Sequence, residues 1–136
     1  MAGKQFVHGL YVTGMTGAGR AAKEEMLFSE VSEGMHAYGV GQHRHMSELD
    51  QEFSLAAKRP VTPTFTPHLI PVNRGILTTL YLAPAQHFAT AEEAAALGAQ
   101  IAACYQAAYA NEPFVRVLEG KALPDTKNVV GTNVLE

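Results

Sequence analysis

Gly39-Val40-Gly41-Gln42-His43-Arg44-His45-Met46-Ser47-Glu48 is the stretch around which the chain is organised, because it joins an expected strand to an expected helix. Ser47 is the expected N-cap of that helix, and Asp50, three residues later, completes an S-x-x-D capping box. His45 would then lie at the positive end of a helix dipole, which disfavours the imidazolium and keeps the ring able to accept a proton. Two histidines and an arginine at a glycine hinge indicate a site. A solvated loop with incidental histidines fits the local pattern equally well.

Length and composition narrow the class of protein. With 136 residues and 47% hydrophobic content, the chain is expected to form one domain with one core. The net charge of −3 and the scattered Lys and Arg residues argue against a nucleic-acid partner. No apolar run approaches the roughly 18–20 residues that cross a bilayer, and no signal-peptide pattern begins the chain. A cytoplasmic protein without a membrane partner is therefore expected. The closing Leu135-Glu136 is typical of a tag remnant, so no weight is placed on it.

Hydrophobic patterns predict nine elements in the order β-α-β-α-β-β-α-β-β. Strands are expected at residues 5–12, 36–40, 61–71, 76–83, 114–118 and 128–134, where β-branched and aromatic residues gather. Helices are expected at 21–31, 47–58 and 90–110. The prolines within 61–71 favour an edge or irregular strand. This order predicts an α+β fold with a mixed, mainly antiparallel sheet and helices packed on one face.

A glycine-rich turn from Gly14 to Arg20 follows the first expected strand. A strand, a glycine turn and a helix N-terminus can together bind an anion through backbone N–H groups. The spacing matches neither the G-x-x-x-x-G-K-[ST] nor the G-x-G-x-x-G nucleotide motif. A tight turn without a ligand is therefore the better interpretation.

The last expected helix begins with a T-x-x-E capping box formed by Thr90 and Glu93. Its predicted inner face consists of Ala94, Leu97, Ile101, Cys104 and Ala108. Cys104, the single cysteine, is therefore expected to be a buried thiol with a packing role, since a catalytic cysteine needs an electropositive, partly open setting. No internal disulfide is possible, and nothing points to an oxidising compartment.

Four segments, in order, carry a combined signature. They are TGAGR with KEEMLFSEV from Thr16, HRHMSE from His43, FTPHLIPVNRG from Phe65, and PFVRV from Pro113 with LPDTK and GTN downstream. Together they resemble N-acetyl-γ-glutamyl-phosphate reductases, enzymes of arginine biosynthesis, over nearly the whole chain. Two departures stand out: Ser47 replaces a proline of the family motif, and Leu10-Tyr11-Val12-Thr13 replaces a polar run.

The resemblance implies a domain organisation. The family's enzymes have a Rossmann domain that holds NADPH and a substrate and dimerisation domain, similar to the C-terminal domain of the glyceraldehyde-3-phosphate dehydrogenase type. Only the second is covered. Residues 1–136 are therefore expected to be a single substrate-binding and dimerisation domain that acts with a Rossmann domain in the same polypeptide. Without the nucleophilic cysteine and the NADP domain it should be inactive alone. A homo-oligomer, dimer or tetramer, is also implied.

The resemblance further implies a mechanism. A cysteine thiolate attacks an acyl-phosphate carbonyl, phosphate leaves, and NADPH reduces the thioester to a semialdehyde. His45 is expected to act as base and oxyanion donor, with His43 as the close alternative and Glu48 orienting His45. The residues expected to hold the carboxylate or phosphate are Arg44, Arg74 and Arg116, with Arg20, Thr16 and Gly17 at the glycine turn. For each arginine, a surface or interdomain ion pair is the alternative.

Three alternatives stay open at this point. His43, His45 and His68 would supply three ligands to a zinc ion, although His68 also fits a hydrogen-bonded structural histidine. A non-catalytic regulatory domain derived from the reductase is a second possibility. The acyl substrate is either N-acetylglutamyl phosphate or a relative such as an aminoadipyl one.

Overall fold

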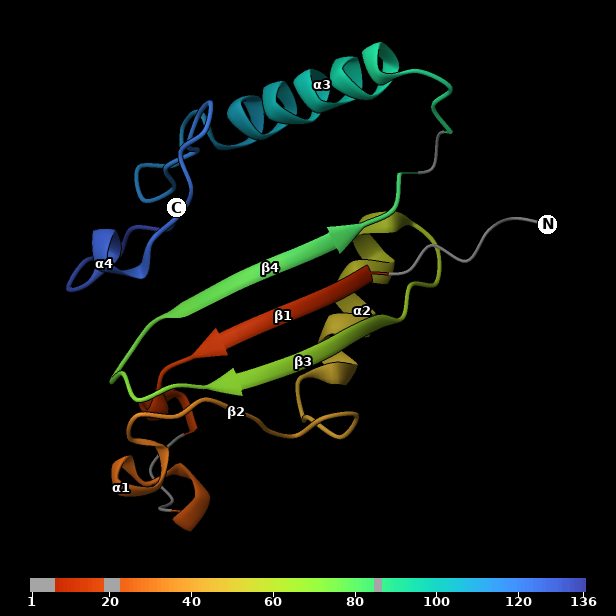
Figure 1. Ribbon diagram of the computed structural model, residues 1–136. Coiled ribbons are helices and arrows are strands. Elements are labelled where there is room, and N and C mark those ends of the chain that lie inside the picture. The colour runs from red at the N-terminus through yellow and green to blue at the C-terminus, as the bar shows by residue number, and fades with distance from the viewer. Residues whose placement is uncertain (1–6, 19–22, 85–86) are drawn as a thin grey trace. The chain divides into compact units, whose positions relative to one another are not determined.

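The computed structural model describes residues 7–18, 23–84 and 87–136, and the chain divides into two compact units, Met1–Pro84 and Ala85–Glu136. Residues 19–22, which include Arg20 and the start of the first expected helix, lie outside the described residues. The elements of the first unit are β1 (Val7–Thr13), η1 (Met15–Ala18), η2 (Glu24–Met26), α1 (Phe28–Val31), β2 (His36–Ala37), α2 (Met46–Ala57), β3 (Pro63–Leu69) and β4 (Ile76–Leu82) (Figure 1). The second unit contains α3 (Ala91–Tyr109) and α4 (Thr126–Val129).

The first unit is built on a four-stranded mixed sheet in the order β2-β3-β1-β4. β1 pairs parallel with β3 and antiparallel with β4, and β2 pairs antiparallel with β3. Gly9 of β1 therefore lies between Phe65 of β3 and Leu80 of β4. The predicted α+β class with a mixed sheet is confirmed.

β3 lies inside the sheet, so the prediction of an edge strand at 61–71 was wrong. The direction of the Pro67 nitrogen explains why an interior strand can contain this proline. The Pro67 carbonyl accepts the Tyr38 N–H at 3.1 Å, so the Pro67 nitrogen also points toward the β2 side and away from β1. Only His68 and Leu69 of β3 pair with β2, so the missing N–H of Pro67 interrupts no rung of the β1–β3 ladder.

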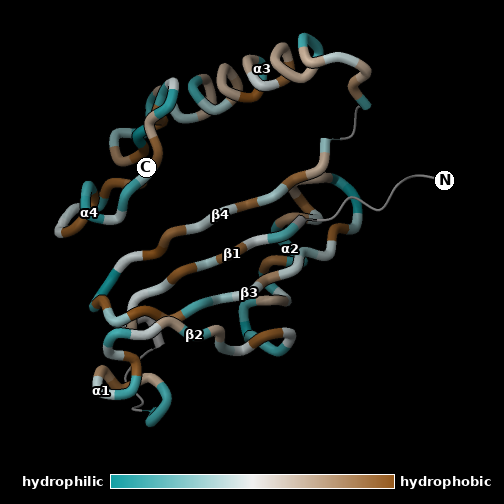
Figure 2. The backbone as a smooth tube through the Cα atoms, in the orientation of Figure 1, coloured by the Kyte–Doolittle hydropathy of each residue, from teal (hydrophilic) through white to brown (hydrophobic). Residues whose placement is uncertain are grey.

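One face of β3 carries the core of the first unit. Side chains along β3 alternate: Pro63, Phe65, Pro67 and Leu69 are buried, and the residues between them are exposed or partly exposed. α2 packs against β3, behind the sheet in Figure 1. Val31 and Val61 are the other buried hydrophobic residues among those described. Figure 2 shows hydrophobic residues along β4 as well, although every side chain of that strand is exposed.

The helix predicted at 21–31 is replaced, in its described part, by the short η2 and α1. The backbone leaves helical geometry at Leu27, which has φ −71° and ψ 144°. The strand predicted at 36–40 is shortened to two residues, because Gly39 and Gly41 take positive φ values of 57° and 70° and turn the chain.

α2 begins one residue earlier than predicted, and its N-cap is His45, so the assignment of Ser47 as N-cap was wrong. The helix ends at Lys58, which adopts the left-handed region with φ 53°. The Ser54 hydroxyl accepts the Val61 N–H at 2.9 Å and joins the end of α2 to the start of β3.

In the second unit, α3 matches the predicted helix. Thr90 is its N-cap and accepts the Glu93 N–H at 3.2 Å, while the Glu93 carboxylate accepts the Ala89 N–H at 2.7 Å. No residue of α3 is buried, and Cys104 is exposed. The prediction of a buried thiol was therefore wrong, since it assumed that the apolar stripe of α3 is covered. Among the described residues, no helix combines the length and the apolar character that crossing a membrane requires.

The two strands predicted at 114–118 and 128–134 are reduced to one parallel bridge between Val115 and Leu135. The segment after Asp125 forms α4 instead, because the Asp125 carboxylate accepts the Lys127 N–H at 3.0 Å and caps the helix. Gly131 then turns the chain with φ 74°.

Candidate functional site

The turn between β2 and α2 carries the histidine pair. The Gln42 N–H donates to the Gly39 carbonyl at 3.0 Å, and the Met46 N–H donates to the His43 carbonyl at 3.0 Å, so two successive turns shape the segment. A Cβ on Gly39 would lie 3.0 Å from Cδ2 of His43. Glycine at this position therefore allows both the positive φ and the close approach of the His43 ring.

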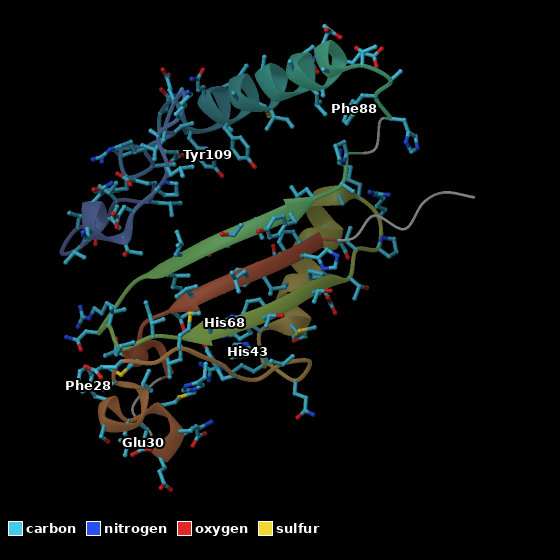
Figure 3. The ribbon with its side chains drawn as sticks, viewed as in Figure 1. Phe28, Glu30, His43, His68, Phe88 and Tyr109 are labelled. Carbon is cyan, nitrogen blue, oxygen red and sulfur yellow. The ribbon has the colours of Figure 1, made fainter. Side chains whose placement is uncertain are left out.

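His43 lies in a group of aromatic rings. Its ring centroid is 5.0 Å from Phe65, 5.5 Å from Tyr38 and 4.9 Å from His45. His43 is half-buried, whereas His45 is exposed. Figure 3 labels His43 in the segment that leads into α2. The structure thus brings the two predicted catalytic histidines together and anchors one of them on β3.

The electrostatic setting of His43 favours the neutral ring. The backbone N–H of His45 donates to Nδ1 of His43 at 3.3 Å. Burial lowers the pKa of His43, and the positive charges of His45 and Arg44 lower it further. The neutral His45 that sequence reasoning expected from a helix dipole stays a prediction.

Tyr38 fixes the start of this turn to the sheet, and sequence reasoning missed it. The Thr13 hydroxyl donates to the His68 carbonyl at 3.3 Å, so in the 3.3 Å contact between Tyr38 Oη and Thr13 Oγ1 the tyrosine is the donor. Its position, directly before the glycine hinge, was the only sequence signal.

Arg44 lies between the two histidines in the chain and Glu48 follows them, and both are exposed. Glu48 lies in the first turn of α2, where a negative charge complements the helix dipole. These two residues, His43 and His45 therefore form one polar group around the α2 N-terminus, which we call the histidine turn.

The glycine turn and Arg74 are also brought together. Gly14, Met15 and Thr16 donate their N–H groups to the carbonyls of Gly75, Val72 and Asn73 at 3.0, 2.9 and 3.2 Å. The Thr16 hydroxyl donates to the same Asn73 carbonyl at 2.5 Å. These three N–H groups are thus committed to the neighbouring turn and do not cradle a phosphate. Gly17 lies within η1, beside them in the chain.

Arg116 belongs to the second unit and forms an ion pair. Its Nη1 donates to Oε1 of Glu136 at 2.7 Å; the Arg116 side chain is 56% exposed and that of Glu136 is 3% exposed. Asn128 and the Asp125 N–H also donate to Glu136, at 3.0 and 3.4 Å. The Asn128 amide is the largest cause of the lowered pKa of Glu136. Glu136, given no weight from sequence, is therefore a structural partner of a predicted substrate residue.

The zinc alternative finds no support. His68 lies on β3 (Figure 3), where it alternates with Phe65 and so points to the opposite face from the ring that contacts His43. Its Nδ1–H donates to the Thr66 carbonyl at 3.2 Å, as expected of a structural histidine. Within the described ranges, no group of three or more His, Cys, Asp or Glu side chains is placed to hold a metal.

Comparison with known proteins adds an independent result. The model of one protein family, described as "Semialdehyde dehydrogenase, dimerisation domain", matches residues 2–136. Proteins named N-acetyl-gamma-glutamyl-phosphate reductase from Afipia carboxidovorans and Rhodospirillum rubrum are each 54% identical to the chain over 122 residues, covering 90% and 89% of it. The protein of that name from Citrifermentans bemidjiense is 49% identical over 122 residues, or 89% of the chain. The chain spans about a third of the length of these curated relatives.

Proposed function

Since the chain belongs to the semialdehyde dehydrogenase dimerisation-domain family, we propose that it is the substrate-binding and dimerisation domain of an N-acetyl-γ-glutamyl-phosphate reductase. The proposal includes a longer native polypeptide with a Rossmann domain, a homo-oligomer, and a place in arginine biosynthesis in the cytoplasm. The observation that best supports a catalytic site is the histidine turn, where the His43 ring packs against Phe65 and His45 is exposed.

This domain contributes the side chains around the acyl phosphate. A nucleophile that attacks an acyl carbonyl needs a base and a donor for the developing oxyanion, and two imidazoles with centroids 4.9 Å apart supply groups for both roles. Arg44 and Arg74 are proposed to bind phosphate or carboxylate, because a guanidinium grips either through two hydrogen bonds. Thr16 and Gly17 shape the turn beside Arg74, and Glu48 is proposed to orient His45 from the first turn of α2.

Arg116 is proposed to reach the substrate only by exchanging its partner. Its guanidinium already holds the Glu136 carboxylate at 2.7 Å, the same chemical group that a carboxylate substrate presents. Arg20 is proposed as a substrate residue on the family resemblance alone, because it lies outside the described residues.

NADP would supply the hydride when bound, but the described residues of this chain do not fit it. The N–H groups of Gly14, Met15 and Thr16 are bonded to carbonyls, and a Cβ on Gly14 would lie 2.8 Å from the Val72 carbonyl oxygen. No cradle for a pyrophosphate is open there. We therefore assign NADP to the Rossmann domain and none to this chain, which alone should be inactive.

The proposal is tested with the longer polypeptide that contains this segment. We expect NADPH oxidation that depends on N-acetylglutamyl phosphate, with weaker turnover of the aminoadipyl analogue. His45→Ala should lower kcat by about 10²–10⁴-fold, the usual contribution of a positioned acid or base. Arg59→Ala, an exposed change at the end of α2, is the matched control. A reading frame without a Rossmann domain, or no NADPH oxidation by the longer polypeptide, would overturn the proposal in favour of a non-catalytic domain. Full turnover after replacement of both His43 and His45 would keep the reductase function but remove the histidine turn from the site.

A further inference from the structure

The hydrogen bond from His45 to His43 determines where the neutral His43 ring carries its proton. The His45 N–H donates to Nδ1 of His43 at 3.3 Å. A neutral imidazole has one donor nitrogen and one acceptor nitrogen, so a ring that accepts at Nδ1 is protonated at Nε2. Nε2 of neutral His43 is therefore a hydrogen-bond donor and has no lone pair with which to take a proton.

The surroundings of His43 oppose its protonation. Phe65 of β3 and Tyr38 after β2 cover the ring with aromatic surface, with centroids 5.0 and 5.5 Å away. Arg44 and His45, its neighbours in the turn, add positive charge, and burial together with these charges lowers the pKa of His43. A half-buried imidazole in this setting stays neutral at pH 7.

We propose that His43 is a neutral hydrogen-bond donor, acting through Nε2–H on the carbonyl oxygen of the acyl phosphate, and that it is not the base. The identity of the acceptor rests on the proposed function, but the position of the proton does not. When the thiol sulfur bonds to the carbonyl carbon, the C=O electron pair moves to oxygen, and the hydrogen bond from Nε2–H strengthens while His43 keeps its proton. The thiol proton goes to the exposed His45. Phosphate leaves when the carbonyl re-forms.

The proton position is measured in this chain directly, by long-range ¹H–¹⁵N NMR of ¹⁵N-labelled histidine above pH 7.5. We expect a pyrrole-type Nε2 and a pyridine-type Nδ1 for His43. His68, which donates from Nδ1 to the Thr66 carbonyl, provides the opposite tautomer in the same spectrum. His45→Ala keeps the N–H at position 45 and should leave the His43 tautomer unchanged. A protonated Nδ1 on His43, or an even mixture of tautomers, would overturn the proposal whatever the enzyme's activity.

The donor role is measured in the longer reductase. Glutamine places an amide nitrogen near the position of Nε2, whereas asparagine places one near Nδ1, so His43→Gln should keep the donor and His43→Asn should lose it. We expect His43→Asn to lower kcat by about 10²–10³-fold, as for loss of one oxyanion donor, with His43→Gln at least tenfold more active. Both should retain the acidic limb of the kcat/KM pH profile. Loss of that limb in both variants would make His43 the base. Unchanged kcat in both would remove His43 from the site while leaving the reductase function intact.

Discussion

The imidazole of His43 packs on the phenyl ring of Phe65, with the ring centroids 5.0 Å apart. Phe65 is 8% exposed and also contacts the Tyr11 ring, 4.3 Å away between centroids. Because β3 is interior and pairs with β1 over seven residues, this phenyl ring is among the most firmly held groups of the first unit. The histidine turn, an irregular segment, is thus positioned by a strand.

Phe65→Leu is expected to weaken this arrangement. Loss of ring contacts in a packed core should lower the free energy of unfolding of the first unit by about 1–2 kcal/mol. The pKa of His43 should rise toward its ordinary value, because burial is the largest cause of its depression. Urea unfolding and an NMR pH titration measure the two effects. Phe114→Leu, at a 57% exposed position, is the control and should change stability by less than about 0.5 kcal/mol. An unchanged His43 pKa in Phe65→Leu would contradict the role of this contact.

Stability should depend on pH through His43. The pKa of His43 is lower in the folded state than its ordinary value of 6.5, so between the two values the unfolded state binds more protons. The free energy of unfolding should therefore fall as pH is lowered through 6.5, and this contribution should level off below the folded pKa. His43→Gln should flatten the dependence in this window, whereas His36→Gln serves as a control for loss of one histidine. Equal slopes in wild type and His43→Gln would show that His43 is not the group responsible.

Gly14→Ala should destabilise the first unit. A Cβ on Gly14 would lie 2.8 Å from the Val72 carbonyl oxygen and 2.9 Å from the Arg74 nitrogen, and both are backbone atoms that cannot rotate away. Overpacking of this kind costs about 1–3 kcal/mol. The midpoint of urea unfolding should fall, and the amides of Met15 and Thr16 should exchange faster with solvent. Wild-type exchange rates would contradict the packing of the two turns.

Gly98→Ala, in contrast, should stabilise the second unit. Gly98 lies within α3, and a Cβ there would meet no atom within 4 Å among the described residues. Alanine in a helix interior is more favourable than glycine by about 0.5–1 kcal/mol. We expect a higher thermal midpoint for the second unit, measured by circular dichroism at 222 nm. A lower midpoint would contradict the open space around this glycine.

Local sequence signals predicted the elements that depend on local interactions. The capping box of Thr90 and Glu93 predicted the start of α3, and the β-branched and aromatic residues of 76–82 predicted β4. Pairing was harder to predict, because it depends on residues far apart in the chain. β3 is interior because the two-residue β2 pairs with its other side, and no pattern within 61–71 reveals that pairing.

In the candidate site, too, the sequence predicted what depends on neighbouring residues and missed what depends on residues far apart in the chain. The HRH segment identified the histidines, yet the sequence could not say that His43 alone reaches the core, since that depends on the position of Phe65 on β3. Ser47 suits an N-cap by type, but the turn from His43 to Met46 makes His45 the N-cap, two residues earlier. Glu136 was dismissed by its place at the end of the chain, although it holds Arg116.

Arg74 provides the last test, because its backbone is fixed while its side chain is exposed. Hydrogen bonds from Gly14 and Met15 to the carbonyls of Gly75 and Val72 hold the turn on both sides of Arg74. If the guanidinium binds the phosphate or carboxylate of the substrate, Arg74→Gln loses a charged hydrogen bond of about 1.5–3 kcal/mol, which raises KM by roughly 10–150-fold. Arg74→Lys should recover part of this, since lysine keeps the charge without the two-pronged geometry. Steady-state kinetics of the longer reductase measure KM in both variants, with Arg59→Gln as the control. A KM within twofold of wild type in Arg74→Gln would assign Arg74 to the protein surface.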